Sequence, residues 1–194
     1  MINVLDLTKR LIAMDTVNPP GNEYYAAKYV GELLEENGFD VEYVPFEGKR
    51  IHVIAGKGFS ETDLPIVFTG HFDTVPLGAE KWSVDPFGGE EKNGKLYGRG
   101  SSDMKSGVAA MVVAAINAFS LGSPEGGVRL VLTAGEELGC QGAKDLIKTY
   151  PRLGKASGIV VGEPTANIPA IGHKGGLYLN LSFSGATFRR KCNL

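Results

Sequence analysis

The segment IVFTGHFDTVP, residues 66–76, is the most informative part of the chain because it joins a buried strand to two polar groups. Its first three residues predict a strand, and Gly70 marks the point where we expect the backbone to tighten. Polar groups at the carboxyl end of such a strand project into the crevice where α/β sheets bind ligands. We expect His71 and Asp73 to point to the same side of the extended chain. A carboxylate beside an imidazole can fix its tautomer and raise its basicity as a metal ligand.

The rest of the chain predicts strands that alternate with helices. Apolar runs indicate strands at residues 41–46, 51–55, 66–69, 128–133, 158–161, 168–171 and 177–183. Helical patterns fall at residues 5–14, 23–37, 106–119 and 142–150, and Gly38 is suited to cap the second helix. A loop-rich segment at residues 81–100 contains a turn at Asn93-Gly94. This order predicts an α/β fold, a three-layer sandwich with helices on both faces of a mixed, mostly parallel sheet.

The composition is that of a globular chain and argues against several kinds of partner. Its 194 residues suffice for one domain with a core, and 43% hydrophobic with 22% charged residues is ordinary. A net charge of −2 predicts neither a nucleic-acid nor a membrane partner. The first residues lack the regions of a signal peptide, and no apolar run is long enough to span a bilayer. Cys140 and Cys192 form no disulfide framework, so we expect a cytoplasmic location.

Three further acidic motifs follow apolar strands or tight turns. Asp103 stands on a turn before an apolar helix, where a lone carboxylate more often caps the helix. Glu136 and Glu137 come directly after a buried strand, where adjacent carboxylates repel each other and need a cation or a raised pKa. On an exposed helix start the same pair would only face solvent. Glu163 also follows a strand, although alone it would more often be a loop residue.

Three other residues of suitable type are weaker candidates. His173 has Lys174 beside it, which disfavours a cation, and no acidic neighbour orients it. His52 alternates with apolar neighbours, so we predict a surface position on a strand. Cys140 follows the glutamates closely, but nothing in the sequence indicates an activated thiol, and a small structural residue is the expectation.

The order of the acidic motifs indicates more than each motif alone. One histidine and several carboxylates, each at a strand end, suit a pair of divalent ions that share a bridging carboxylate. Zinc accepts such nitrogen and oxygen ligands. Two metal ions about 3.5–4 Å apart can bind a bridging water and polarise a carbonyl group.

The whole series resembles the zinc-dependent amidohydrolases that include acetylornithine deacetylase, succinyl-diaminopimelate desuccinylase, glutamate carboxypeptidase and aminoacylase. The resemblance covers the chain to about residue 183, in the order that the family has. The matching segments are NPPG (18–21), GHFDTVP (70–76), GRGSSDMK (98–105), TAGEE (133–137) and GEPT (162–165). It implies a zinc exopeptidase-like fold that is incomplete at its C-terminus.

The resemblance also implies roles for these residues. His71 and Glu163 would bind one metal, Glu137 the second, and Asp103 both. Asp73 would act in catalysis by orienting His71, while Glu136 would be the general base that deprotonates water and passes the proton to the leaving amine. The family also places a non-proline cis peptide after the bridging aspartate. The implied cofactor is Zn²⁺, two ions in the family and one or two here, with Co²⁺ as a substitute.

The chain departs from the family after Gly185. Family members are about twice as long and insert a lid and dimerisation domain, whereas residues 184–194 are basic and follow no pattern. We therefore expect a catalytic portion at residues 1–183 followed by an off-pattern tail. The chain would then be a truncated or frameshifted product. It would be inactive if the absent lid and last histidine ligand are essential. Unequal filling of the two metal positions and self-association through uncovered surface would follow.

The resemblance implies a metal-dependent hydrolase that cleaves the amide bond of N-acyl amino acids or small peptides. Two alternatives remain open at this point. A dinuclear zinc aminopeptidase would share the sheet and a similar order of ligands. A non-catalytic metal-binding or assembly module would not require a general base such as Glu136.

Overall fold

The computed structural model describes residues 2–60, 62–172 and 182. The chain divides into two compact units, one that ends at Pro164 and one that begins at Thr165. All helices and strands of the described residues belong to the first unit. The predicted boundary between residues 183 and 184 lies outside the described residues.

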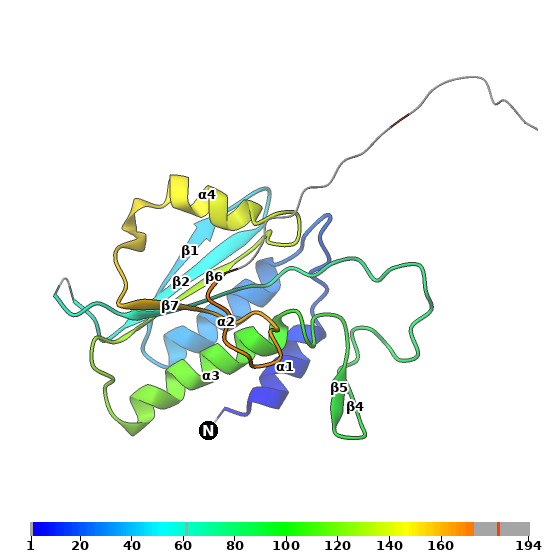
Figure 1. The fold of residues 1–194 in the computed structure, drawn as a ribbon, viewed down its shortest axis with the longest axis horizontal. Helices are drawn as coiled ribbons and strands as arrows, with labels where there is room; N and C mark the ends of the chain where they lie inside the picture. The colour runs from blue at the N-terminus through cyan, green and yellow to red at the C-terminus, as the bar shows by residue number, and fades with distance from the viewer. Residues whose placement is uncertain (1, 61, 173–181, 183–194) are drawn as a thin grey trace, which may run out of the picture. The chain divides into compact units, whose positions relative to one another are not determined.

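A five-stranded mixed sheet forms the centre of the first unit (Figure 1). The hairpin strands β1 (Asp40–Pro45) and β2 (Ile51–Lys57) pair antiparallel, and β2 pairs antiparallel with β6 (Val128–Thr133). The strands β6, β3 (Ile66–His71) and β7 (Gly158–Val161) are parallel neighbours. The predicted mixed sheet is confirmed; within this five-stranded sheet two pairings are parallel and two are antiparallel, so neither kind predominates. In spatial order the strands are β1, β2, β6, β3 and β7.

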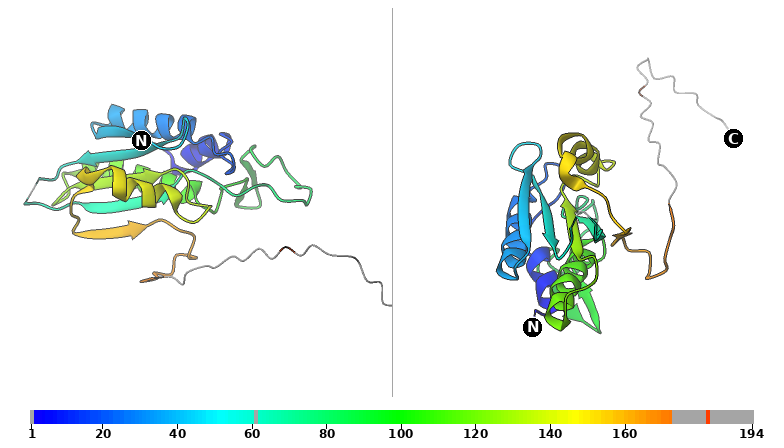
Figure 2. Two further views of the ribbon diagram at one scale, coloured as in Figure 1. Left: turned by 90° about the horizontal axis from the view of Figure 1, so that it is seen from above. Right: turned by 90° about the vertical axis from the view of Figure 1, so that its left-hand side faces the viewer.

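Helices cover both faces of this sheet, which confirms the predicted three layers (Figures 1 and 2). The helices α1 (Val4–Ile12), α2 (Tyr24–Glu36) and α3 (Lys105–Leu121) bury the larger apolar cluster against one face. The helix α4 (Gln141–Thr149) and the 3₁₀ helix η1 (Pro151–Leu153) pack on the opposite face in a smaller cluster. Figure 1 shows α4 above the strands and the other three helices below them.

Local sequence explains where several elements begin and end. The helix α2 ends before Gly38, which has a φ of +77° and supplies the left-handed conformation that most residues avoid. The turn at Asn93-Gly94 is confirmed; both residues have positive φ and join the short strands β4 (Glu90–Lys92) and β5 (Lys95–Tyr97). Those two strands were not predicted, because their exposed charged residues carry no alternating pattern.

Two predictions about strands are wrong and one lies outside the described residues. Residues 168–171 form no strand, and Ile168 and Ile171 are exposed. His52 is fully buried instead of lying on the surface, because helices cover both faces of β2. The predicted strand at residues 177–183 falls outside the described residues, apart from Ser182.

None of the helices that the structure describes combines the length and the apolar character needed to cross a bilayer.

Candidate metal centre

His71 ends strand β3 and is almost completely buried. Its Nδ1 lies 2.9 Å from the backbone oxygen of Asp73, so Nδ1–H donates to this oxygen and Nε2 is the nitrogen that faces the carboxylates of the site. Gly70 does not tighten the backbone as predicted. Its missing side chain leaves room for the side chain of Met104. A β-carbon at position 70 would lie 2.5 Å from Cε of Met104, whose sulfur accepts the His71 N–H. The strand end and Met104 together fix the orientation of the imidazole.

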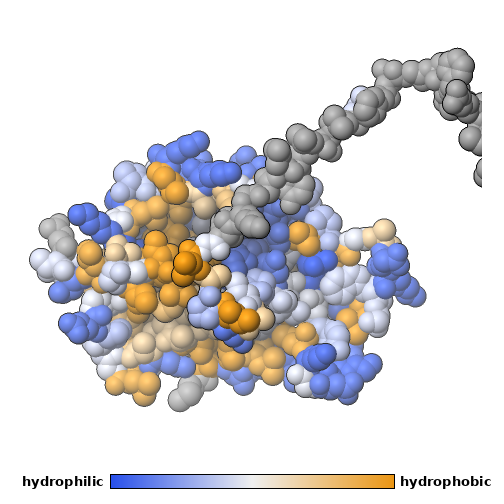
Figure 3. Space-filling view, viewed as in Figure 1, coloured by the Kyte–Doolittle hydropathy of each residue, from blue (hydrophilic) through white to orange (hydrophobic). Residues whose placement is uncertain are grey.

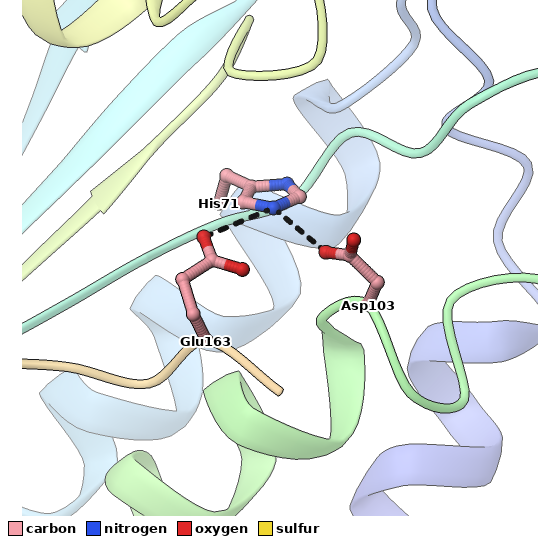
Figure 4. Close-up of side chains that lie close together, drawn as sticks. All are labelled: His71, Asp103 and Glu163. Carbon is pink, nitrogen blue, oxygen red and sulfur yellow. Dashed lines mark hydrogen bonds and ion pairs between the residues drawn. The ribbon is translucent and has the colours of Figure 1, made fainter. Parts of the chain in front are cut away.

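Two carboxylates converge on the free nitrogen of His71 (Figure 4). Nε2 lies 3.2 Å from Oδ1 of Asp103, which precedes α3, and 3.6 Å from Oε1 of Glu163, which follows β7. One ligand atom from each of the three residues lies within 4.8 Å of the other two. Three segments that are far apart in the sequence therefore bring one imidazole and two carboxylates to a single point.

Asp103 faces His71 and does not cap the helix that follows it. The peptide between Asp103 and Met104 is cis, as the family resemblance implied, and no side chain caps the first turn of α3. The Asp103 side chain is 52% exposed. The capping role that a lone carboxylate would more often have is thus wrong here.

Glu136 and Glu137 lie at the rim of the same site. Oε2 of Glu136 is 3.9 Å from Nε2 of His71, and its Oε1 accepts the thiol of Cys140 at 3.1 Å. Glu137 does not belong to the group of three ligand atoms found among the described residues. Burial raises the pKa of Glu137 to about 7, and the nearby charge of Asp103 contributes. A neighbouring cation would relieve this repulsion.

The carboxylate of Asp73 is fully buried and connects the two sides of the site. It accepts the backbone N–H groups of Glu136 and Glu137 at 2.9 and 3.1 Å and the side-chain amide of Asn18 at 2.9 Å. Its Oδ1 is 3.5 Å from Nδ1 of His71. Burial would raise the pKa of Asp73, but the hydrogen bonds from His71 and from these three donors hold it well below its usual range.

The electrostatics of the group indicate a place for positive charge. Burial alone would lower the pKa of His71, but Asp103, Asp73 and Glu163 raise it to about 11. Burial raises the pKa of Glu163, and Asp103 and Glu136 raise it further against the lowering effect of His71. Repelling carboxylates around one imidazole are stabilised by either a proton or a metal ion.

The donor set fits a divalent metal ion. A metal ion would displace the proton from Nε2 of His71, whose other ring nitrogen is already engaged, and Asp103 and Glu163 each offer a carboxylate oxygen. Zinc binds this combination of nitrogen and oxygen ligands. The backbone carbonyl behind His71 supplies the outer hydrogen bond that metal-bound histidines ordinarily have.

Several residues of the site were missed at the sequence level. Asn18 was noted only as part of a motif, yet its side chain binds the buried carboxylate of Asp73. Lys105 is fully buried, and its ammonium donates to the backbone oxygens of Leu11 and Met14, which anchors the turn that carries Asp103. Burial lowers the pKa of Lys105 to about 8. A lysine after an aspartate carries no sequence signal for such a position.

Comparison with known proteins identifies the family. Residues 67–179 match peptidase family M20/M25/M40, and this segment contains every candidate ligand. Succinyl-diaminopimelate desuccinylase 2 from Ruegeria sp. is 36% identical over 192 residues, 95% of this chain and 48% of that protein. The chain therefore spans about half the length of this curated relative.

Solved structures agree on the fold. An M20 family metallo-carboxypeptidase, Sso-CP2 from Sulfolobus solfataricus, superposes with a TM-score of 0.73 at 21% identity, covering 84% of this chain and 37% of that chain. The Bacillus subtilis protein YXEP, described as a dinuclear metal binding peptidase, gives a TM-score of 0.60 at 21% identity, covering 81% of this chain and 41% of that chain. The match over residues 67–179 and the 36% identity show that the chain belongs to peptidase family M20/M25/M40, a family of metallopeptidases and amidohydrolases.

Proposed function

We propose that this chain supplies the metal-binding catalytic portion of a hydrolase that cleaves the amide bond of N-acyl amino acids or small peptides. The observation that carries the proposal is the convergence of Asp103 and Glu163 on Nε2 of His71, with Glu136 at 3.9 Å from the same nitrogen. The 36% identity to a desuccinylase supports an acyl amino acid as substrate.

The proposal gives each side chain one task. His71, Asp103 and Glu163 would hold one divalent ion, which we propose to be Zn²⁺, and Asp103 and Glu137 would hold a second. Ions bound there would polarise the substrate carbonyl and lower the pKa of a water molecule. Glu136 would be the base that accepts a proton from water and the acid that gives it to the leaving amine. Asp73 keeps His71 and the Glu136–Glu137 backbone in place.

A turnover assay with three substrate classes tests the proposal. The full chain is incubated with added Zn²⁺ or Co²⁺ and with N-succinyl amino acids, N-acetyl amino acids or aminoacyl anilides. We expect the parent chain to hydrolyse the N-acyl substrates. Glu136→Gln should abolish this hydrolysis without changing the metal content. The exposed variant Glu90→Gln is the control and should retain parental activity.

The other outcomes of this assay point to the alternatives. Cleavage of aminoacyl anilides alone would identify an aminopeptidase. Metal binding without turnover in the parent chain would favour a non-catalytic metal-binding or assembly module, or an inactive chain. A cytoplasmic location is also part of the proposal and rests on the low number of cysteines.

We further propose that copies of the chain associate through strand β7. Within the part of the chain that the structure describes, β7 is an edge strand that pairs with β3 (Figure 2). Its residues Ile159, Val160 and Val161 are 66, 43 and 57% exposed, on a face with much hydrophobic surface (Figure 3). Apolar edges of this kind promote pairing between chains. Sedimentation velocity should show association that Ile159→Lys reduces; a parent that stays monomeric at high concentration would contradict it.

A further inference from the structure

Four successive backbone amides between β6 and α4 are each held by a buried side chain. The N–H groups of residues 134, 135, 136 and 137 donate at 3.1, 3.2, 2.9 and 3.1 Å, respectively. The acceptors are Nδ1 of His52, Oε1 of Glu23 and the two carboxylate oxygens of Asp73. The backbone that carries Glu136 and Glu137 is thus fixed by side chains.

The acceptors come from three different elements. His52 lies on β2, Glu23 precedes α2, and Asp73 follows β3. All three are fully buried. Asp73 already belongs to the site because it contacts His71, but His52 and Glu23 contact none of the candidate metal ligands through their hydrogen bonds.

Glu23 is itself held in place by Arg50. The Nε and Nη2 atoms of Arg50 donate to the two carboxylate oxygens of Glu23 at 2.8 and 2.5 Å, and both side chains are buried. Arg50 also lies over the ring of Phe46, with 4.9 Å between Cζ and the ring centroid. A two-point ion pair of this kind fixes the direction of the carboxylate.

The backbone of Gly135 fits closely against this pair. Its φ is +74°, and a β-carbon there would lie 2.7 Å from Phe46 and 3.1 Å from Nη2 of Arg50. Any other residue at position 135 would displace the backbone that leads to Glu136. The position of the turn is therefore set by the ion pair as well as by Asp73.

We propose that Glu23 and His52 are positioning residues that place Glu136 and Glu137 through the amides of Gly135 and Ala134. The inference rests on the proposed function, in which Glu136 moves the proton and Glu137 binds the second ion. If the ion pair had a purely structural role, any well-packed replacement would leave the amide exchange of the turn and the binding of metal unchanged. Buried ion pairs often contribute little net stability relative to such a replacement.

The decisive variant keeps the packing and removes the acceptor. Glu23→Leu/Arg50→Met replaces the ion pair by apolar side chains of similar length, so the unfolding midpoint should fall only by the cost of leaving the Gly135 N–H without its acceptor. The matched control is Glu47→Gln, which removes an exposed carboxylate 3.8 Å from the same arginine but contacts no amide of the turn. A second pair is His52→Leu, which removes the acceptor for Ala134, and His52→Asn, which offers an oxygen in place of Nδ1.

Two measurements separate positioning from stability. Amide hydrogen exchange of residues 134–137 is followed by NMR in the metal-free chain, and Co²⁺ binding is titrated separately. In the double variant we expect Gly135 and Glu136 to exchange about tenfold faster and Co²⁺ to bind about tenfold more weakly. His52→Leu should likewise speed the exchange of the Ala134 amide, and His52→Asn should return most of this amide's protection against exchange.

The exchange data decide the inference even if the proposed function fails. Parental exchange rates in the double variant and in His52→Leu would overturn it, whether or not the parent binds Co²⁺. If the parent does not bind Co²⁺ but the variants show the faster exchange, the metal site is refuted and the positioning of the turn remains supported. Should the double variant not fold, the His52 pair gives the same comparison.

Discussion

Asp73 is the residue on which both sides of the site depend. Its backbone oxygen fixes the ring of His71, and its carboxylate binds the amides of Glu136 and Glu137. One buried residue therefore sets the distance between a candidate ligand and the proposed base. The sequence predicted the contact with His71 but not the two amides, because spacing along the chain gives no information on which distant backbone donors meet a carboxylate.

Replacing Asp73 by Asn should destabilise the fold and weaken metal binding. The amide nitrogen of Asn cannot accept either backbone N–H, so one buried donor loses its partner, and the charge that strengthens the others is lost. We expect a loss of about 2 kcal/mol or more in unfolding free energy, measured by urea unfolding. The control Asp85→Asn, at an exposed carboxylate that accepts one amide, should cost far less.

His52 should make the stability of the chain depend on pH below neutrality. Burial lowers its pKa from about 6.5 to about 4, with Asp145 acting to raise it and Arg50 to lower it. Because the unfolded chain takes up a proton at higher pH than the folded chain, stability falls as pH drops from about 6.5 to about 4. The contribution is on the order of 3 kcal/mol.

Comparison with a variant isolates this effect from the carboxylates that titrate in the same range. As the pH falls from 7 to 4, the unfolding free energy of the parent should fall relative to that of His52→Asn. A difference that is independent of pH would show that His52 does not titrate in this way. Urea unfolding at five pH values measures it.

The position of His52 also shows why alternation along a strand was misleading. A polar residue between apolar ones predicts a solvent face only where one face of the sheet is exposed. Here every residue from Ile51 to Ala55 is buried, since α2 and α3 cover one face and α4 the other. The sequence predicted helices on both faces, and that expectation is in conflict with a surface histidine on a central strand.

At the scale of elements, the distance between α3 and the end of β7 decides whether Glu163 reaches His71. Gly107 on α3 faces the carbonyl oxygen of Gly162, the residue before Glu163. A β-carbon at position 107 would lie 2.4 Å from this oxygen, and backbone atoms cannot give way as a flexible side chain can. This close approach holds Glu163 beside the first turn of α3.

Gly107→Ala should therefore lower both stability and metal affinity. Alanine would ordinarily stabilise a helix by about 1 kcal/mol relative to glycine, so a net loss would identify the clash. We expect thermal unfolding at a lower temperature and weaker Co²⁺ binding as Glu163 moves away from His71. The exposed site Ala110→Gly calibrates the helix propensity alone, and a more stable Gly107→Ala protein would contradict the prediction.

The strands and helices that were predicted correctly share a strong local signal. Strands β6 and β7 have the predicted bounds, and α3 has nearly the predicted bounds, because their apolar runs end at glycine or polar residues. Residues 168–171 have a similar apolar character but form no strand. Pairing with a neighbouring strand, which a local pattern does not contain, decides that outcome.

At the scale of the whole molecule, the site exists only when the first unit is folded. His71, Asp103 and Glu163 come from the ends of β3, the start of α3 and the end of β7, and packing of the sheet against α3 brings them together. Ions that bind such a group bind the folded chain and not the unfolded one. Metal binding and folding stability are therefore linked.

We expect one ion to bind tightly and a second more weakly. The described residues bring three ligand atoms together around His71, whereas Glu137 lies outside this group and shares only Asp103 with it in the proposed site.

A free Co²⁺ concentration of about 100 times the dissociation constant should stabilise the chain by about 2.7 kcal/mol, and a chelator should reverse this stabilisation. Glu163→Gln should abolish most of the stabilisation, while Glu137→Gln should leave the first binding step intact. Calorimetric titration and metal analysis after dialysis measure both steps, and two equally tight ions per chain would refute the asymmetry.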